Sequence, residues 1–381
     1  MNRIRRREFM AIAGGAGLAA ITACTHVRMG ASSPDPFHHQ SHRPASRLPI
    51  ALNSNENPLG PCNSAVEAGI KAVADFSNRY ALEQRDELVM DLVRFHGLNP
   101  GQILLGCGAI ELLKIIADIF CSQRTPPIIS DPVYEAIAYF AGLRSINAIK
   151  VPAGTGEKGH DLDAMLKRVH AGGEMVYVCN PCNPTGGVLG KSELISFIRK
   201  VPGDVIIVVD EAYAEYLGPE FFSCLDLVRS GAPNLLVIRT FSKVYGLAGL
   251  RVGYCAGDSR LINAMAGHRL WNNINQAGAA AAREALKDGR WAARVRGENE
   301  KTRETFCMGL EKLGVEFFPS KASYVLLSAG KPWEETHGYL RSKGILGGRK
   351  IPSMPQHIRI SIGNNDEMAY CLDVLGEFKR L

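Results

Sequence analysis

The sequence Arg239-Thr240-Phe241-Ser242-Lys243-Val244-Tyr245-Gly246-Leu247-Ala248-Gly249-Leu250-Arg251-Val252-Gly253-Tyr254 holds the chemistry around which the rest of the chain is arranged. Apolar runs typical of strands flank it, at residues 235–238 and 250–256. Between them lies a loop of small residues and hydroxyls that contains Lys243. A lysine in such a loop stays partly desolvated, which favours its neutral, nucleophilic amine.

The side chains of this stretch together match one kind of ligand. The amine of Lys243 can form a Schiff base with an aldehyde. Thr240 and Ser242 can donate to an anion, and the planar fork of Arg251 can bind a phosphate. Pyridoxal 5'-phosphate is an aldehyde that carries a phosphate, so it meets all of these groups. A surface Ser-Lys pair before a strand is also common, so other segments must decide between the two interpretations.

Composition indicates a soluble protein with a large core and argues against a nucleic-acid partner. The chain has 381 residues, of which 46% are hydrophobic, enough for a large core and two lobes. Charged residues make up 22%, which is ordinary for a soluble protein. Much of the net charge of +6 comes from the arginines in residues 3–7. No basic cluster alternates with aromatic residues, so we expect no nucleic-acid partner.

The first 47 residues predict an export signal followed by a tether. Arg6-Arg7-x-Phe9, before a Gly/Ala-rich apolar run, resembles a twin-arginine signal. This signal and its lipobox occupy residues 1–24, with Cys24 as the lipidated residue. Residues 25–47 are rich in Ser, Pro and His and are expected to be disordered. We therefore expect a periplasmic or membrane-anchored lipoprotein; an uncleaved anchor or a mis-assigned start codon is the alternative.

Cys179 and Cys182 have CxxC spacing, but no metal site is expected. The chain contains no second CxxC and no His pair that would complete a zinc site. Cys179 follows an apolar run and is interpreted as a small core residue. A redox role of the CxxC pair is the alternative.

The periodicity predicts an α/β fold with two domains. Strands alternate with helices from about residue 102 to 257, which indicates a mostly parallel, mixed sheet between two layers of helices. The apolar, β-branched run at residues 205–209 is typical of a strand buried on both faces. We assign residues 78–286 to this large, cofactor-binding domain. Residues 48–77 and 287–381 are assigned to a smaller α+β domain.

Polar residues follow several of the predicted strands, where open α/β sheets bind ligands. Asp210 ends the strand at 205–209, and a carboxylate there needs a partner such as a pyridinium N–H; capping of the next turn is the alternative. Tyr213 can donate to the phenolic oxygen of the same ring. Tyr134 follows another strand and is otherwise a rim residue. Arg359, inside a strand, can bind a substrate carboxylate unless it faces solvent.

From about residue 48 onward the chain resembles the fold-type I, class I/II aminotransferases, and within them the histidinol-phosphate aminotransferase group. Four motifs carry the resemblance in the family's order: Asn55-Glu56-Asn57-Pro58-x-Gly60, Asn180-Pro181-x-Asn183-Pro184-Thr185-Gly186, Asp210-Glu211-x-Tyr213, and Ser242-Lys243 with Arg251 eight residues on.

The resemblance implies pyridoxal 5'-phosphate as the cofactor and a role for each matching residue. Lys243 would carry the cofactor and move the α-proton of the substrate. Asp210 would pair with the pyridine nitrogen, and Asn183 and Tyr213 would hydrogen-bond the ring oxygen. Tyr134 would stack on the ring. The phosphate would be held by Thr240, Ser242, Arg251 and the amides of Ala109 and Ile110.

The same resemblance implies where substrate and partner bind. Arg359 would bind the substrate carboxylate, with Asn55 and Arg349 beside it. Tyr80 would reach the phosphate of a second subunit, which implies a homodimer. Two departures concern the site: Ala109 and its neighbour stand where the family places a hydroxyl or an acid, and Arg349 is displaced by one position.

We therefore expect an aminotransferase that moves an amino group between an amino acid, or a histidinol-phosphate-like amine, and a 2-oxo acid. A decarboxylase or lyase on the same scaffold is the first alternative, because it would use the same residues with the substrate turned differently. A cofactor-binding protein without turnover is the second alternative.

Overall fold

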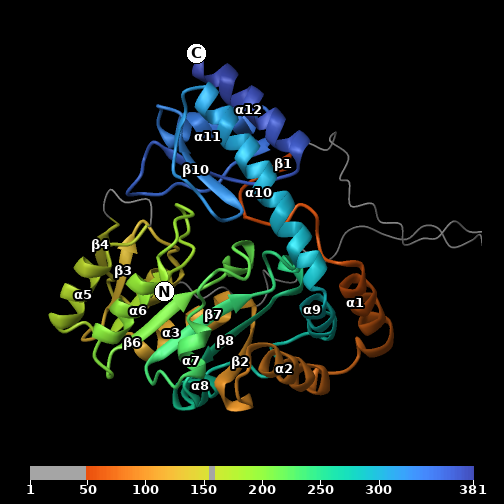
Figure 1. Cartoon of the computed structure of the whole chain (residues 1–381), viewed down its shortest axis with the longest axis vertical. Helices are drawn as coiled ribbons and strands as arrows, with labels where there is room; N and C mark the ends of the chain where they lie inside the picture. The colour runs from red at the N-terminus through yellow and green to blue at the C-terminus, as the bar shows by residue number, and fades with distance from the viewer. Residues whose placement is uncertain (1–48, 154–158) are drawn as a thin grey trace, which may run out of the picture. The chain divides into compact units, whose positions relative to one another are not determined.

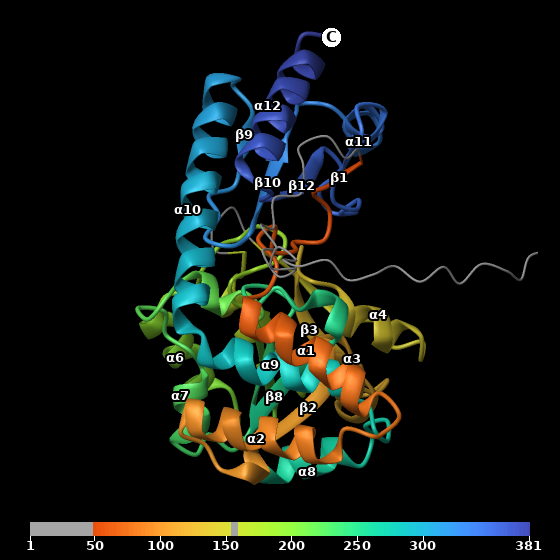
Figure 2. The same cartoon turned by 90° about the vertical axis from the view of Figure 1, so that its right-hand side faces the viewer.

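A computed structural model describes residues 49–153 and 159–381. They form a large lobe around a seven-stranded sheet and a small lobe around a three-stranded sheet (Figures 1 and 2). The predicted signal, lipobox and tether lie outside these residues. Within the described ranges, no helix has both the length and the apolar character needed to cross a bilayer.

The sheet of the large lobe is mixed but mostly parallel, as predicted. Its strand order is β2-β8-β7-β6-β5-β3-β4, and β8 runs antiparallel to both of its neighbours. The strands are β2 (Ile103–Cys107), β3 (Pro127–Asp131), β4 (Ile149–Pro152), β5 (Met175–Cys179), β6 (Ile206–Asp210), β7 (Leu235–Thr240) and β8 (Val252–Gly257).

Strand β6 shows why helices cover both faces of this sheet. Ile207 and Val209 belong to the apolar cluster on one face, Val208 belongs to the cluster on the other, and all three are fully buried. The first face is covered by α2 (Leu82–His96), α5 (Leu162–His170), α6 (Lys191–Lys200), α7 (Leu225–Arg229) and α9 (Gln276–Lys287). The second is covered by α3 (Gly108–Phe120), α4 (Ala136–Gly142) and α8 (Ser259–Ala266). The prediction of a strand buried on both faces is confirmed.

The small lobe is built on an antiparallel sheet of order β12-β10-β9. Its strands are β9 (Glu316–Phe317), β10 (Tyr324–Ser328) and β12 (His357–Ser361), and a short parallel pair joins β1 (Ile50–Ala51) to β11 (Ile345–Leu346). The helices are α10 (Gly289–Lys312), α11 (Trp333–Ser342) and α12 (Asn365–Lys379). The long helix α10 runs from the large lobe into the small one (Figure 1).

The N-terminal part of the described chain contributes to both lobes. Helix α1 (Asn63–Phe76) packs against α9 in the large lobe, as both views show (Figures 1 and 2). Strand β1, which precedes it, pairs with β11 in the small lobe. The segment 48–77, which we assigned to the small domain, therefore crosses the boundary between the lobes within its described part, residues 49–77.

Candidate active site

A cavity of about 410 Å³ lies where the carboxyl ends of the parallel strands meet the small lobe. It brings together almost all of the residues expected from the sequence. Its lining includes Asn55, Ala109, Ile110, Tyr134, Asn183, Asp210, Tyr213, Thr240, Ser242, Lys243, Arg251, Arg349 and Arg359. The exception is Tyr80, which is not in this lining and is 74% exposed just before α2.

Lys243 stands in the loop after β7 and points into the cavity. Its Nζ donates to the carbonyl of Ser54 at 2.9 Å and lies 5.6 Å from the ring centroid of Tyr213. Burial, and then the positive charge of Arg359, lower the pKa of Lys243 to about 8. Roughly a tenth of the amine is therefore neutral at pH 7, far more than for an ordinary lysine, and the neutral form is the nucleophile.

Asp210 ends β6 and is 2% exposed. One carboxylate oxygen accepts from the amide of Ala212 at 3.0 Å, and the other accepts from the hydroxyl of Tyr177 at 2.8 Å. Burial nevertheless raises the pKa of Asp210 to about 6. Asp210 therefore caps the turn and can still bind a cationic ligand. Its two hydrogen-bond donors are neutral and compensate its buried charge only in part.

Tyr177 is a site residue that our sequence reasoning missed. It lies on β5, one strand over from Asp210, and is fully buried. The signal in the sequence is a lone tyrosine in the apolar run Met-Val-Tyr-Val-Cys at 175–179, since a buried phenol needs a hydrogen-bond partner. Which partner it finds depends on the register between β5 and β6, where Cys179 pairs with Asp210.

Hydroxyl, amide and guanidinium donors gather at the other end of the cavity. The hydroxyl of Thr240 donates to that of Ser242 at 2.9 Å, and Arg251 Nη1 lies 3.5 Å from the same Ser242 oxygen. Helix α3 begins at Gly108, so its first amides point into this region. Gly108 has a φ of 71°, and a Cβ there would clash with the Arg251 guanidinium. The glycine therefore lets the arginine lie against the helix start.

The hydroxyl of Tyr213 is placed by two amide side chains. It accepts from Asn55 Nδ2 at 2.8 Å and from Asn183 Nδ2 at 3.5 Å. Burial raises the pKa of Tyr213, so the phenol keeps its proton at neutral pH. Because its lone pairs face the two amides, its own O–H is left to donate.

Two arginines from the small lobe complete the lining. Arg359, on β12, is 7% exposed and donates to Asn183 Oδ1 and to the carbonyl of Asn53, both at 2.7 Å. Its Nε is buried and has no hydrogen-bond partner among the described residues. The alternative that Arg359 faces solvent is therefore wrong. Arg349, half exposed, pairs with Glu135 and lies 5.7 Å from the ring centroid of Tyr134.

The cavity fits pyridoxal 5'-phosphate in the types of group it offers. A buried carboxylate with a raised pKa matches a pyridinium nitrogen, and the Tyr213 hydroxyl matches the ring oxygen. An amine with a lowered pKa matches the aldehyde. The donors around Ser242 match the phosphate.

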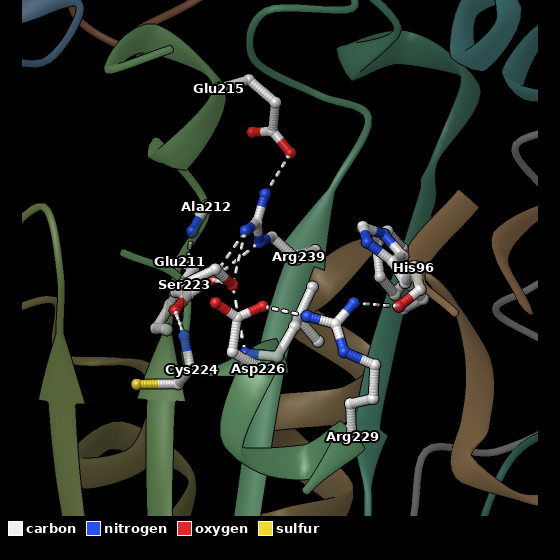
Figure 3. Close-up of polar contacts among 12 residues, drawn as sticks. His96, Glu211, Ala212, Glu215, Ser223, Cys224, Asp226, Arg229 and Arg239 are labelled. Atoms are coloured by element: carbon white, nitrogen blue, oxygen red, sulfur yellow. Dashed lines mark hydrogen bonds and ion pairs between the residues drawn. The ribbon is translucent and has the colours of Figure 1, made fainter. Parts of the chain in front are cut away.

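A buried ion-pair network lies beside these residues and joins the ends of β6 and β7 (Figure 3). Arg239, next to Thr240 in the chain, donates from Nε to Glu211 at 2.9 Å, from Nη1 to Glu215 at 2.7 Å and from Nη2 to Ser223 at 2.9 Å. Glu211 is fully buried. Because side chains alternate along a strand, Glu211 points away from the cavity that its neighbour faces.

The CxxC pair has no redox-active character. Cys179 and Cys182 are both buried, and burial raises the pKa of Cys182 to about 11 and that of Cys179 well above its ordinary value. A reactive thiol needs a lowered pKa and exposure. Both behave as core residues, as Cys179 was interpreted.

Comparison with known proteins agrees with this geometry. The model of the family "Aminotransferase class I and II" matches residues 49–375. A histidinol-phosphate aminotransferase of Bacillus pumilus is 34% identical over 339 residues, which cover 86% of this chain and 90% of the relative. Another, from Thiobacillus denitrificans, is 32% identical and covers 96% of both chains.

A solved structure shares the fold. The histidinol-phosphate aminotransferase of Sinorhizobium meliloti, in complex with pyridoxal 5'-phosphate, has a TM-score of 0.81 and 26% identity, and the match covers 92% of this chain and 95% of that one.

Our prediction of twin-arginine export, a lipidated Cys24 and a periplasmic or membrane-anchored location is wrong. The relatives that match over most of the chain are named histidinol-phosphate aminotransferases, and nothing in these matches points to export. The match to the Thiobacillus denitrificans enzyme, which covers 96% of this chain, includes part of residues 1–47. An arginine pair before a short Gly/Ala-rich run is weak evidence for export, because such a pattern can arise from composition alone.

The ion pair of Arg239 should contribute strongly to stability. Arg239→Met leaves the buried Glu211 without its cation, and we expect the free energy of unfolding to fall by roughly 3–5 kcal/mol. The matched control is Arg260→Met, which breaks an exposed pair with Asp258 and should leave stability unchanged. Urea denaturation followed by circular dichroism checks both; equal midpoints for Arg239→Met and wild type would contradict the prediction.

The lowered pKa of Lys243 should show in how the apoprotein captures its cofactor. Only the neutral amine attacks an aldehyde, so the rate of pyridoxal 5'-phosphate capture should rise with pH around a midpoint of about 8. Stopped-flow absorbance measures it, with Nα-acetyl-lysine as the control for the aldehyde's own titration. Arg359→Met should move the midpoint upward, because it removes a nearby positive charge. A midpoint near that of the free lysine would show that Lys243 is not desolvated.

Proposed function

Because the chain belongs to the aminotransferases of class I and II, we propose that its amino donor is histidinol phosphate or a closely similar phosphorylated amine. The chain is a pyridoxal 5'-phosphate-dependent aminotransferase, and it moves an amino group between an amino-group donor and a 2-oxo acid. The proposal adds the identity of the donor and the roles of individual residues. The observation that carries it is the buried Arg359, whose Nε has no partner among the described residues, in the same cavity as Lys243.

Lys243 is assigned the proton transfer. Its neutral amine would take the α-proton from the substrate and deliver it to the former aldehyde carbon of the cofactor, because Lys243 is the one lysine among the described residues that line the cavity. When bound, the cofactor supplies a ring that accepts the electron pair left behind. Asp210 keeps the ring nitrogen protonated through a buried charge pair. Tyr213 and Asn183 donate to the ring oxygen, and Tyr134 packs against the ring.

The phosphate of the cofactor is assigned to the donors at the start of α3 and the end of β7. Thr240 and Ser242 supply hydroxyls, and Arg251 supplies a guanidinium. Ala109 and Ile110 have no polar side chain, so their contribution is through backbone amides, which suits an anion at a helix N-terminus.

The two remaining arginines support an anionic substrate. A guanidinium binds carboxylate and phosphate with the same bidentate geometry, so Arg359 can hold a phosphorylated amine in one half-reaction and a 2-oxo acid in the other. Arg349, at the rim and paired with Glu135, is the second candidate for the distal anion. Asn55 lines the same cavity and donates to the Tyr213 hydroxyl.

A homodimer is part of the proposal. Tyr80 is exposed and lies outside the cavity of its own subunit. Nearby, α1 exposes Ile70, Val73 and Phe76, and Leu82 starts α2. Apolar side chains gathered in this way on one side of a protein are typical of an interface. We assign Tyr80 to the cofactor phosphate of the second subunit.

The visible spectrum of the holoenzyme tests the donor. Histidinol phosphate should bleach the band of the lysine-bound cofactor, and 2-oxoglutarate should restore it. Lys243→Ala should slow turnover at least about 100-fold. Arg359→Ala tests the binding of the oxo acid. It should raise the KM for the oxo acid about 10- to 100-fold, because it removes hydrogen bonds to a charged group.

Product analysis separates the outcomes of this experiment. Bleaching by another amino acid, with histidinol phosphate inert, would leave the aminotransferase in place but reject the donor. Release of CO₂ from an amino acid would indicate the decarboxylase instead. A band that no amine alters would indicate cofactor binding without turnover. Arg349→Ala, as the matched arginine at the rim, should change the KM for the oxo acid less than Arg359→Ala does.

Mixed dimers test the assignment of Tyr80. A dimer of one Lys243→Ala chain and one Tyr80→Ala chain has one site with both residues intact if Tyr80 acts across the interface. Co-expression with two different tags isolates this hybrid, and we expect it to recover about half of the wild-type activity, because a two-fold dimer has two sites. Activity no higher than that of the Tyr80→Ala homodimer would reject the assignment.

A further inference from the structure

Ser361 is buried beside the cavity but does not line it. It lies on β12 two residues after Arg359, so the two side chains share one face of the strand. The Ser361 hydroxyl makes both of its contacts with one residue, Asn55. It accepts from the Asn55 backbone amide at 2.8 Å and donates to Asn55 Oδ1 at 2.9 Å.

The direction of these bonds is determined by the backbone. An amide N–H can only donate, so the Ser361 oxygen must accept from it. The serine O–H is then free for one acceptor, and Asn55 Oδ1 is within reach. Asn55 has a φ of 54°, a left-handed conformation that asparagine adopts more readily than most residues. Asn55 is 1% exposed, so water does not compete for these groups.

The orientation of the Asn55 amide in turn determines what Tyr213 does. With Oδ1 at Ser361, Nδ2 faces Tyr213 and donates to its hydroxyl at 2.8 Å. Asn183 Nδ2 approaches the same oxygen at 3.5 Å. Both amides are donors, so the phenol accepts on that side and its own proton points elsewhere.

The opposite orientation of Asn55 is disfavoured. Turning the amide would place Nδ2 at Ser361 and leave the buried serine O–H without an acceptor. It would also present Oδ1 to Tyr213, whose proton would then be used within the protein. Ser361 is therefore the group that distinguishes the two orientations.

We propose that Ser361 is a positioning residue, which acts through Asn55 to keep the Tyr213 hydroxyl proton directed into the cavity toward the ring oxygen of the cofactor. The inference rests on the proposed roles of Lys243 and Tyr213. Arg359 holds the carbonyl of Asn53 at 2.7 Å, so Ser361 and the arginine secure the same short segment.

The pH dependence of the bound cofactor's visible absorption tests the proposal. Tyr213 would donate to the ring oxygen of the cofactor. The negative charge of this oxygen is least compensated when the nitrogen that joins Lys243 to the cofactor has lost its proton, so the hydrogen bond favours loss of that proton. A weakened donor should therefore raise the pH at which the band changes. We expect Ser361→Ala to raise this midpoint by about one pH unit, the effect of one hydrogen bond to a charged group. Ser361→Cys, closer in size, should give a smaller shift.

A double-variant cycle shows whether the effect passes through Tyr213. Tyr213→Phe should raise the midpoint by itself, and Ser361→Ala should then add nothing to it. Ser328→Ala, a buried serine of the neighbouring strand β10 that bonds Gly330 and not Asn55, is the matched control and should leave the midpoint unchanged. The kcat of Ser361→Ala should fall more than its KM changes, because substrate contacts are intact.

The outcomes separate this inference from the proposed function. If the wild-type protein gives no visible band with pyridoxal 5'-phosphate, the proposed roles of Lys243 and Tyr213 are themselves rejected. If Tyr213→Phe shifts the midpoint but Ser361→Ala does not, the positioning role of Ser361 is rejected while the roles of Lys243 and Tyr213 stand. Equal shifts from Ser361→Ala with and without Tyr213→Phe would also reject it.

Discussion

A carboxylate at the end of an entirely apolar strand is the constraint on which this structure depends. Asp210 is 2% exposed and has two neutral donors, and burial still raises its pKa to about 6. Such a group destabilises the fold unless a cation meets it. The rest of the cavity supplies the shape for that cation, because β3, β5, β6 and β7 all end at the same edge of the sheet.

The charge of Glu211, the next residue in the chain, is compensated within the protein itself. Glu211 is as buried as Asp210, but it has a permanent protein cation in Arg239. The alternation of a strand places the compensated charge on one side and the uncompensated charge on the other. The two adjacent acids thus have different roles: Glu211 stabilises the ends of β6 and β7, and Asp210 can bind a ligand. The ion pair keeps the strand ends in place around the charge that it does not itself compensate.

Much of this arrangement could be predicted from the sequence, because the evidence for it is local. The buried strand at 205–209, the acid that ends it and the lysine loop at 239–254 are each visible in a short window. Tyr177, the carbonyl of Ser54 and the hydroxyl of Ser361 could not be predicted in their roles. The first depends on the register of β5 against β6, and Ser361 meets Asn55 across 306 residues of chain. The export prediction is wrong because it rested on a short local pattern alone, and the relatives do not support it.

The segment 53–55 explains how the two lobes can act on one reaction. Arg359 holds the carbonyl of residue 53, Lys243 holds that of residue 54, and Tyr213 accepts from the side chain of residue 55. Three groups assigned to substrate, proton transfer and cofactor thus bond successive residues of one strand-free stretch. A substrate anion that competes for the Arg359 guanidinium loosens the first of these bonds, and the second is lost whenever the amine engages an aldehyde. The backbone of residues 53–55 is thus the structural link between the arginine of the small lobe and the lysine and tyrosine of the large lobe.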